Sequence, residues 1–191
     1  MSPTWTVLEH GSLIQLAENL WWIDGEVPRM ALRRSCTIAR RRDGGLVIHS
    51  AICLDEPTQA KVEALGPIAH VIVPNAFHRM DAPRYAARYP DARIVAPLGG
   101  RSRIADVVRV DLTADAFPNG DDLSIVPFDG THGQENVLRV HSQDGVTLVF
   151  NDALFNVPHQ AGFGGLVLRA IGSSGGPKAT PLARFSLYKD K

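Results

Sequence analysis

Polar side chains that can hold a metal ion or transfer a proton follow three short apolar segments of this sequence. The segments are residues 71–73, 125–128 and 146–150, and each has the length and composition of a buried strand. The side chains that follow them are, in order, Asn75, His78, Arg79 and Asp81, then His132 and Glu135, then Asn151 and Asp152. Loops at strand ends are where α/β proteins usually place their chemistry, so we predict that the three loops converge on one site.

The sequence around these loops predicts a mixed order of strands and helices. The predicted strands are, in chain order, residues 12–23 (as two strands), 35–39, 46–50, 71–73, 92–96, 107–112, 123–128, 136–140 and 146–150. The predicted helices are residues 56–65, 83–89, 99–106, 165–171 and 181–189. Asp-Gly-Gly at 43–45 predicts a hairpin turn, and 173–177 predicts a loop. The chain thus opens as a β-meander, continues as βαβαβ and returns to hairpins.

Length and composition predict one domain in a reducing compartment. The 191 residues suffice for a single domain with a sizeable core. Lys plus Arg and Asp plus Glu both number 20, so the chain lacks the basic footprint of a nucleic-acid-binding protein. No apolar run approaches a membrane span, and no signal peptide opens the chain. Cys36 and Cys53 stand in apolar segments without CxxC spacing, which predicts buried, reduced thiols in a cytoplasmic protein.

The order of elements and two of the loops resemble the metallo-β-lactamase superfamily over residues 13–155. In that family a late loop carries a His near a Gly, and a later strand ends in an Asp that bridges two metal ions. Here Gly130-Thr-His-Gly133 stands at the late loop, and Asp152 stands at the end of the later strand. The resemblance implies an α/β (α+β) fold, a four-layer αββα sandwich in which residues 1–191 form one domain. It also implies that the family's final C-terminal strand, with its His, is missing.

The first metal-binding motif of the family, His-x-His-x-Asp-His, is replaced in this chain. The residues at its four ligand positions are Asn75, Phe77, Arg79 and Met80. His49 stands where the family often has an Asp after an apolar run. The chain is most similar to an uncharacterised, motif-degenerate branch that has an Asn followed by a His in this loop and a Glu, here Glu135, before the penultimate strand.

The donors that remain are sufficient for one metal ion. A catalytic zinc site takes about three protein ligands and keeps one position open. We predict His78, His132 and Asp152 as ligands of one divalent ion, which the resemblance implies is zinc, iron or manganese. The other polar candidates for the site are Asn75, Asp81, Glu135 and His49.

Three of these residues have a structural alternative. Asp81 stands two residues before Pro83, a spacing typical of a helix N-cap. His78 can instead hydrogen-bond the backbone of its own loop, and His132 can be a turn residue. Asp152 is harder to explain as packing, because a carboxylate at a buried strand end needs a partner.

Two functions follow from the sequence, and they leave open whether the protein is an enzyme. The first is a hydrolase with a reduced site, in which one bound ion lowers the pKa of a water that attacks an ester, amide or phosphoester. The second is a metal-free, non-catalytic relative that binds a small molecule or a protein partner. In that case Asn75, His78, His132 and Asp152 form a hydrogen-bonded polar network.

Overall fold

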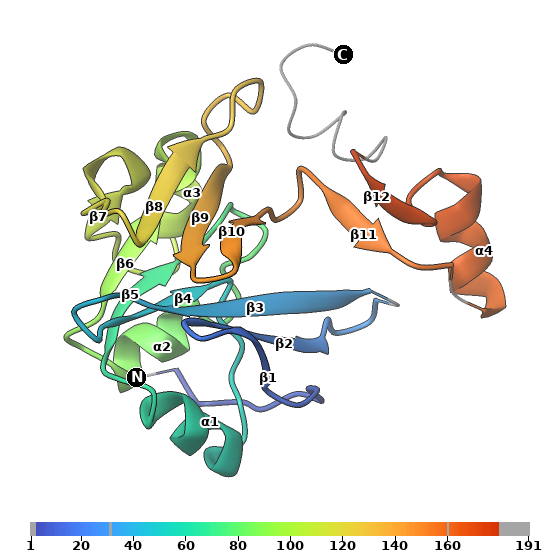
Figure 1. Cartoon of the computed structure of the whole chain (residues 1–191). Helices are drawn as coiled ribbons and strands as arrows, with labels where there is room; N and C mark the ends of the chain where they lie inside the picture. Colours follow the sequence, from blue (N-terminus) through green and yellow to red (C-terminus); the bar gives the residue numbers. More distant parts are fainter. Residues whose placement is uncertain (1–2, 31, 160, 180–191) are drawn as a thin grey trace.

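The computed structural model describes residues 3–30, 32–159 and 161–179, and their elements form an α+β sandwich (Figure 1). The strands are β1 (Ile14–Ala17), β2 (Leu20–Glu26), β3 (Arg33–Arg40), β4 (Leu46–His49), β5 (Ile68–Ile72), β6 (Arg93–Ala96), β7 (Leu112–Thr113), β8 (Leu123–Pro127), β9 (Asn136–Ser142), β10 (Gly145–Val149), β11 (Phe155–Val157) and β12 (Gly176–Lys178). The helices are α1 (Glu56–Glu63), α2 (Ala82–Arg88), α3 (Arg101–Ala105) and α4 (Gly162–Ala170), with 3-10 turns at Leu98–Gly100 and Ala114–Ala116.

The large sheet joins an antiparallel half to a parallel half. Its strand order is β1-β2-β3-β4-β5-β6-β7. Strands β1 to β4 are antiparallel neighbours, whereas β4 to β7 run parallel. The predicted hairpin turn at 43–45 is confirmed, with Gly44 at a φ of 87° that suits glycine. Because β4 and β5 are parallel, their carboxyl ends lie at the same edge of the sheet.

Alternating side chains of the large sheet build two separate cores. On one face, Ile48 and other apolar strand residues pack against Val62 of α1, Tyr85 of α2 and Ile104 of α3. On the other face, Val47 and its neighbours pack against Leu138 and the rest of a three-stranded antiparallel sheet, β10-β9-β8. Adjacent residues of a strand point to opposite faces, which explains why both β4 residues are fully buried. Each such side chain stabilises the fold by roughly 1.5–3 kcal/mol.

The body therefore stacks three layers: helices, large sheet and small sheet. The predicted α+β sandwich of the metallo-β-lactamase type is confirmed, and the described residues of the body form three of the four predicted layers. Helix α4 lies away from these layers, beside β11 and β12 (Figure 1). Val146 and Leu148 on β10 are about half exposed. The assignment of residues 1–191 to one domain stays a prediction.

Residues 155–159 and 161–178 form a small unit, the arm, which projects from the body after β10 (Figure 1). In the arm, β11 pairs antiparallel with β12, and α4 connects them. The predicted loop at 173–177 is wrong at its end, because Gly176 and Pro177 pair with β11 although Gly and Pro lack strand propensity. The strand predicted over 107–112 is wrong except at its last residue, because β7 consists of Leu112 and Thr113. The predicted helix at 181–189 and any final strand lie outside the described residues.

Two further predictions bear on compartment. Cys36 and Cys53 are free and buried, as predicted, and burial raises the pKa of each thiol to about 12. Among the described residues, no helix has the length and apolar character to cross a membrane. The cytoplasmic location stays a prediction.

Candidate functional site

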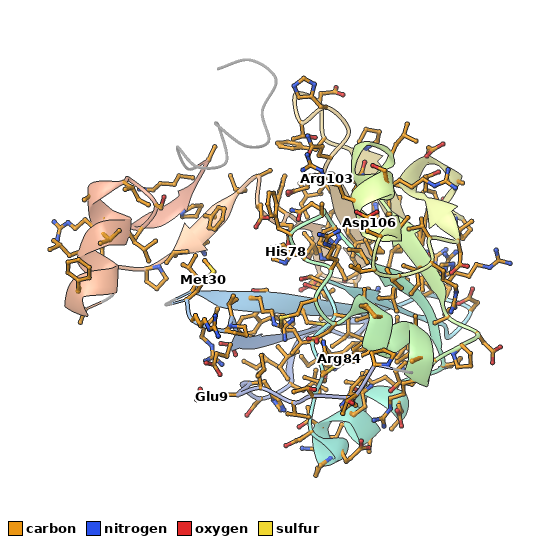
Figure 2. The ribbon with its side chains drawn as sticks, turned by 180° about the vertical axis from the view of Figure 1, so that it is seen from behind. Glu9, Met30, His78, Arg84, Arg103 and Asp106 are labelled. Atoms are coloured by element: carbon orange, nitrogen blue, oxygen red, sulfur yellow. The ribbon has the colours of Figure 1, made fainter. Side chains whose placement is uncertain are left out.

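Four chain segments bring polar side chains together at the carboxyl edge of β4 and β5. Ser50 follows β4, and Asn75 and His78 lie in the loop after β5. Glu135 stands immediately before β9, and Asp152 follows β10. Figure 2 shows His78 on the side of the body that faces the arm. We call these five residues the polar cluster.

His78 is held between a carboxylate and a hydroxyl. Its Nε2 lies 3.0 Å from Asp152 Oδ1, and its Nδ1 lies 3.1 Å from Ser50 Oγ. Its backbone N–H also donates to Asn75 O at 3.2 Å. The side chains of His78 and Asp152 are each 20% exposed, so solvent reaches the pair while the rest of the polar cluster is buried.

Asn75 bridges the two carboxylates of the polar cluster. Its Nδ2 donates to Asp152 Oδ2 at 2.8 Å and reaches Glu135 Oε2 at 3.3 Å. Its Oδ1 accepts from the N–H of Phe77 at 2.8 Å, which fixes the orientation of the amide. A neutral donor, the Asn75 amide, therefore lies between two acids. Asn75 stands at the first position of the His-x-His-x-Asp-His motif of the family that the sequence resembles.

Glu135 anchors the chain around Asp152. Its carboxylate accepts the backbone N–H groups of Asn151 at 2.9 Å, Asp152 at 3.0 Å and Ala153 at 3.0 Å. Successive N–H groups that point at one carboxylate form a strong anion site. Burial raises the pKa of Glu135, and the N–H groups of Ala153 and Asn151 offset part of this, so the pKa stays above its ordinary value.

Asp152 is kept ionised by its partners. Burial acts to raise the pKa of Asp152, but the hydrogen bond and charge of His78 and the hydrogen bond of Asn75 outweigh it. The net pKa lies below its ordinary value. Asp152 is therefore an acceptor at neutral pH, and His78 Nε2 must carry the proton between them. In neutral His78, Nδ1 is then the free base, so Ser50 must donate to it.

His49 is buried beside the polar cluster but forms no hydrogen bond with it. Burial, with a contribution from nearby His78, lowers the pKa of His49 to about 3. The ring lines a cavity of about 10 Å³ together with Pro74 and Asn136. This volume is near the minimum for one water molecule. His49 is thus a neutral core residue at the edge of the site.

Asp81 has a structural role in a different place. It occupies the N-cap position of α2, as predicted, but its side chain makes no capping hydrogen bond. The carboxylate instead pairs with Arg34 at 2.6 Å and Arg84 at 3.0 Å, and accepts from the N–H of Cys53 at 3.2 Å. Because the Asp81 carboxylate forms an ion pair with buried Arg34, it does not accept a hydrogen bond from the N-terminal N–H groups of α2. The predicted capping role of the side chain is therefore wrong.

The structure does not bring His132 into the polar cluster. His132 is exposed and has a φ of 53°. Its loop packs by its backbone, with the N–H of Gly99 donating to Gly133 O at 2.9 Å. Within the described part of the chain, the His132 ring has no hydrogen-bond partner. Of the three predicted ligands, only His78 and Asp152 lie together.

The donor set does not fit a three-ligand metal site. Among residues 3–30, 32–159 and 161–179, no group of three His, Cys, Asp or Glu side chains is arranged to hold a metal ion. The lone pairs of Asp152 accept from His78 and Asn75, and those of Glu135 accept from three backbone N–H groups and Asn75. Hydrogen-bond donors neutralise the two acids where a cation would do so in a metal site.

Ser50 is the site residue that the sequence did not reveal. It follows the buried strand β4 directly, so it stands at a strand end, as the predicted residues do. Its neighbour His49 is a site candidate only through the resemblance to the metallo-β-lactamase superfamily. A polar residue at the end of each of two adjacent parallel strands is the signal that identifies Ser50.

The chain is similar to solved metallo-β-lactamases in structure, whereas no family model and no curated protein matches it. The enzyme from Hirschia baltica superposes with a TM-score of 0.52 and 16% identity, covering 71% of this chain and 67% of that one. FIM-1 from Pseudomonas aeruginosa, solved in a mono-zinc form, gives 0.49 and 10%, covering 71% and 66%. The chain thus spans about two thirds of the length of these proteins. At 16% identity the likeness to the Hirschia baltica protein establishes the fold and not the activity. This chain has the metallo-β-lactamase fold.

Proposed function

We propose that this protein is a metal-free relative within the metallo-β-lactamase fold, with His78 as a proton acceptor and donor toward a small polar molecule. The observation that carries this proposal is the 3.0 Å contact between His78 Nε2 and Asp152 Oδ1. Both residues are predicted metal ligands, and in this contact the His78 Nε2 atom that could bind an ion faces a carboxylate oxygen of Asp152 instead.

The charges of the polar cluster support a site that is complete without a cation. Two carboxylates lie close enough to share Asn75, and two neighbouring acids repel each other unless donors or a metal neutralise them. Here the neutralising groups are three backbone N–H groups, the Asn75 amide and the ring of His78. The metal-dependent hydrolase that the sequence suggested needs these same lone pairs for an ion.

The chemistry available to His78 is general acid–base catalysis. Asp152 holds the proton on Nε2 and stabilises the imidazolium that forms when Nδ1 accepts a proton. A positioned histidine typically accelerates proton transfer by about 10²- to 10⁴-fold. The 20% exposure of His78 and Asp152 gives a small polar molecule access to the pair. Three members of the polar network that the sequence suggested for a non-catalytic relative, Asn75, His78 and Asp152, are thereby assigned a proton-transfer role, and His132 is not part of it.

The test is metal binding by the tag-free protein. Elemental mass spectrometry of the purified chain should find no stoichiometric zinc, iron or manganese, and calorimetric titration with zinc should show no saturable binding. The matched variants are Asp152→Asn, which changes the polar cluster, and Asp106→Asn, which changes an exposed carboxylate. Near-stoichiometric metal that disappears in Asp152→Asn and persists in Asp106→Asn would overturn the proposal in favour of the metal-dependent hydrolase.

A further inference from the structure

Ser50 has the surroundings of an activated nucleophile. Its Oγ lies 3.1 Å from His78 Nδ1, and the far nitrogen of that ring lies 3.0 Å from Asp152 Oδ1. Because Asp152 is an acceptor, the Nε2 atom carries the ring proton and Nδ1 accepts from the hydroxyl. The three side chains form a continuous Ser–His–Asp relay, with the two ring nitrogens in the reverse sense to serine proteases.

The backbone at Ser50 is strained. Its φ is 58°, a left-handed conformation that is uncommon for any residue other than glycine, and the residue is only 2% exposed. Ser50 N–H donates to Ile72 O at 3.0 Å, which ties this turn to the neighbouring strand. Strained, non-glycine backbone positions cluster at functional sites.

A hydrogen-bond donor for a developing negative charge lies next in the chain. The backbone N–H of Ala51 makes no hydrogen bond within the described residues, although Ala51 is 7% exposed. The N–H of the residue after the nucleophile is one of the two donors that stabilise the oxyanion in strand-turn nucleophile sites. An N–H without a partner at this position is available to stabilise the oxyanion of an acyl-transfer reaction.

We propose that Ser50, His78 and Asp152 form a serine-nucleophile site for short-chain acyl esters. This inference rests on the proposed function, because it requires Asp152 and His78 to be free of a metal ion. The burial of Ser50, which is 2% exposed, restricts the acyl group to a small one, and His78 and Asp152 are the partly exposed members of the site.

The reaction proceeds in two balanced steps. Ser50 Oγ attacks the ester carbonyl carbon while its proton moves to His78 Nδ1, and the C–O bond to the leaving alcohol breaks as the alcohol takes that proton. Water then attacks the acyl-serine carbon and gives a proton to Nδ1. Finally, the Ser50 Oγ–C bond breaks, Oγ regains the proton, and the carboxylic acid leaves. Asp152 stays ionised throughout and holds the Nε2 proton.

The first experiment uses methanesulfonyl fluoride, a small reagent that sulfonylates activated serines with loss of fluoride. Intact and peptide mass spectrometry of the wild-type chain in EDTA should locate one adduct on Ser50. Ser50→Gly should give no adduct and should fold, because glycine suits a φ of 58°. Ser35→Gly removes an exposed serine of β3 and should label as the wild type does. His78→Gln should slow labelling by at least about 100-fold.

A second variant guards against low reagent access. In Ser50→Cys the introduced thiol should react with iodoacetamide at pH 7, and Cys36 and Cys53 should stay unmodified because both are buried. Hydrolysis of p-nitrophenyl acetate by the wild type should fall to background in Ser50→Gly. The inference is overturned if Ser50 is not sulfonylated, if His78→Gln labels at the wild-type rate, or if the introduced thiol is inert. Those outcomes leave the metal-free proposal standing, whereas stoichiometric zinc binding overturns both.

Discussion

His78 Nε2 lies 3.0 Å from Asp152 Oδ1, although the two residues are 74 positions apart in the sequence. This contact connects the two partly exposed members of the polar cluster. It joins the loop after β5 to the segment after β10, which belong to different sheets of the sandwich. The site therefore depends on how the two sheets pack. Some side chains near the site maintain the contact between His78 and Asp152, whereas others only stabilise the fold.

Asn75→Asp should destabilise the protein at neutral pH. The change removes the donor between Asp152 and Glu135 and places a third carboxylate there. We expect the free energy of unfolding to fall by about 3 kcal/mol at pH 7, from lost charge-assisted hydrogen bonds and added repulsion. The loss should shrink toward pH 4, as carboxylates in the folded state take up protons. Urea denaturation at both pH values measures this, with exposed Asn156→Asp as a control that should change stability by less than about 0.5 kcal/mol.

Glu135→Gln should loosen the segment that positions Asp152. The neutral amide is a weaker acceptor for the N–H groups of Asn151, Asp152 and Ala153, so we expect a loss of about 2 kcal/mol. Amide hydrogen exchange at residues 151–153 should accelerate. Glu18→Gln is the matched control, because Glu18 is exposed and accepts one backbone N–H, from Gln143. Equal effects of the two substitutions would contradict the anchoring role of Glu135.

Asp81→Asn should be costly for a different reason, since it leaves buried Arg34 without its counter-ion. Removal of one partner of a buried ion pair costs about 3–5 kcal/mol. The same change in an Arg34→Met background should cost markedly less, because no buried charge is then left unpaired. Thermal and urea unfolding of the wild type, the two single variants and the double variant measure this coupling as a double-mutant cycle. The exposed pair of Arg79 and Asp106 provides the control, where Asp106→Asn should be nearly neutral.

We expect buried His49 to lower the free energy of unfolding of the protein on acidification. Its pKa is lowered to about 3 in the folded protein, against about 6.5 when unfolded, so only the unfolded chain takes up the proton between these values. Acid therefore favours unfolding. The unfolding free energy of the wild type should fall by about 2 kcal/mol more than that of His49→Gln between pH 7 and pH 5. If the unfolding free energies of the two proteins changed with pH in the same way, the lowered pKa of His49 would be contradicted.

Strand patterns account for the part of the site that could be predicted. The apolar segments before Asn75, before Glu135 and before Asp152 identify strand ends, and strand ends of a sandwich meet at its edge. The alternation of apolar residues likewise predicts nearly all the strands of the body. In the arm, β12 contains Gly176 and Pro177, which give no strand signal, so its pairing depends on tertiary contacts.

The parts that could not be predicted depend on backbone angles and distant partners. The φ of 58° at Ser50 directs its hydroxyl to His78, and no sequence pattern encodes that angle. The positive φ values of His132 and Gly133 likewise set the course of their loop, which packs on Gly99 and leaves the ring exposed. The spacing of Asp81 to Pro83 predicts a helix cap, but Arg34 on a separate strand binds its carboxylate. In each case, long-range packing overrides a local signal.

The most direct test of the account is the protonation of the His78 ring, measured by long-range ¹H–¹⁵N correlation spectroscopy with and without excess zinc. We expect one tautomer at neutral pH, with Nε2 protonated toward Asp152 and Nδ1 unprotonated toward Ser50, and no change when zinc is added. Asp152→Asn should disturb this tautomer preference. A ¹⁵N shift of Nε2 characteristic of metal coordination on addition of zinc would contradict the central claim that the His78–Asp152 pair works without a metal ion.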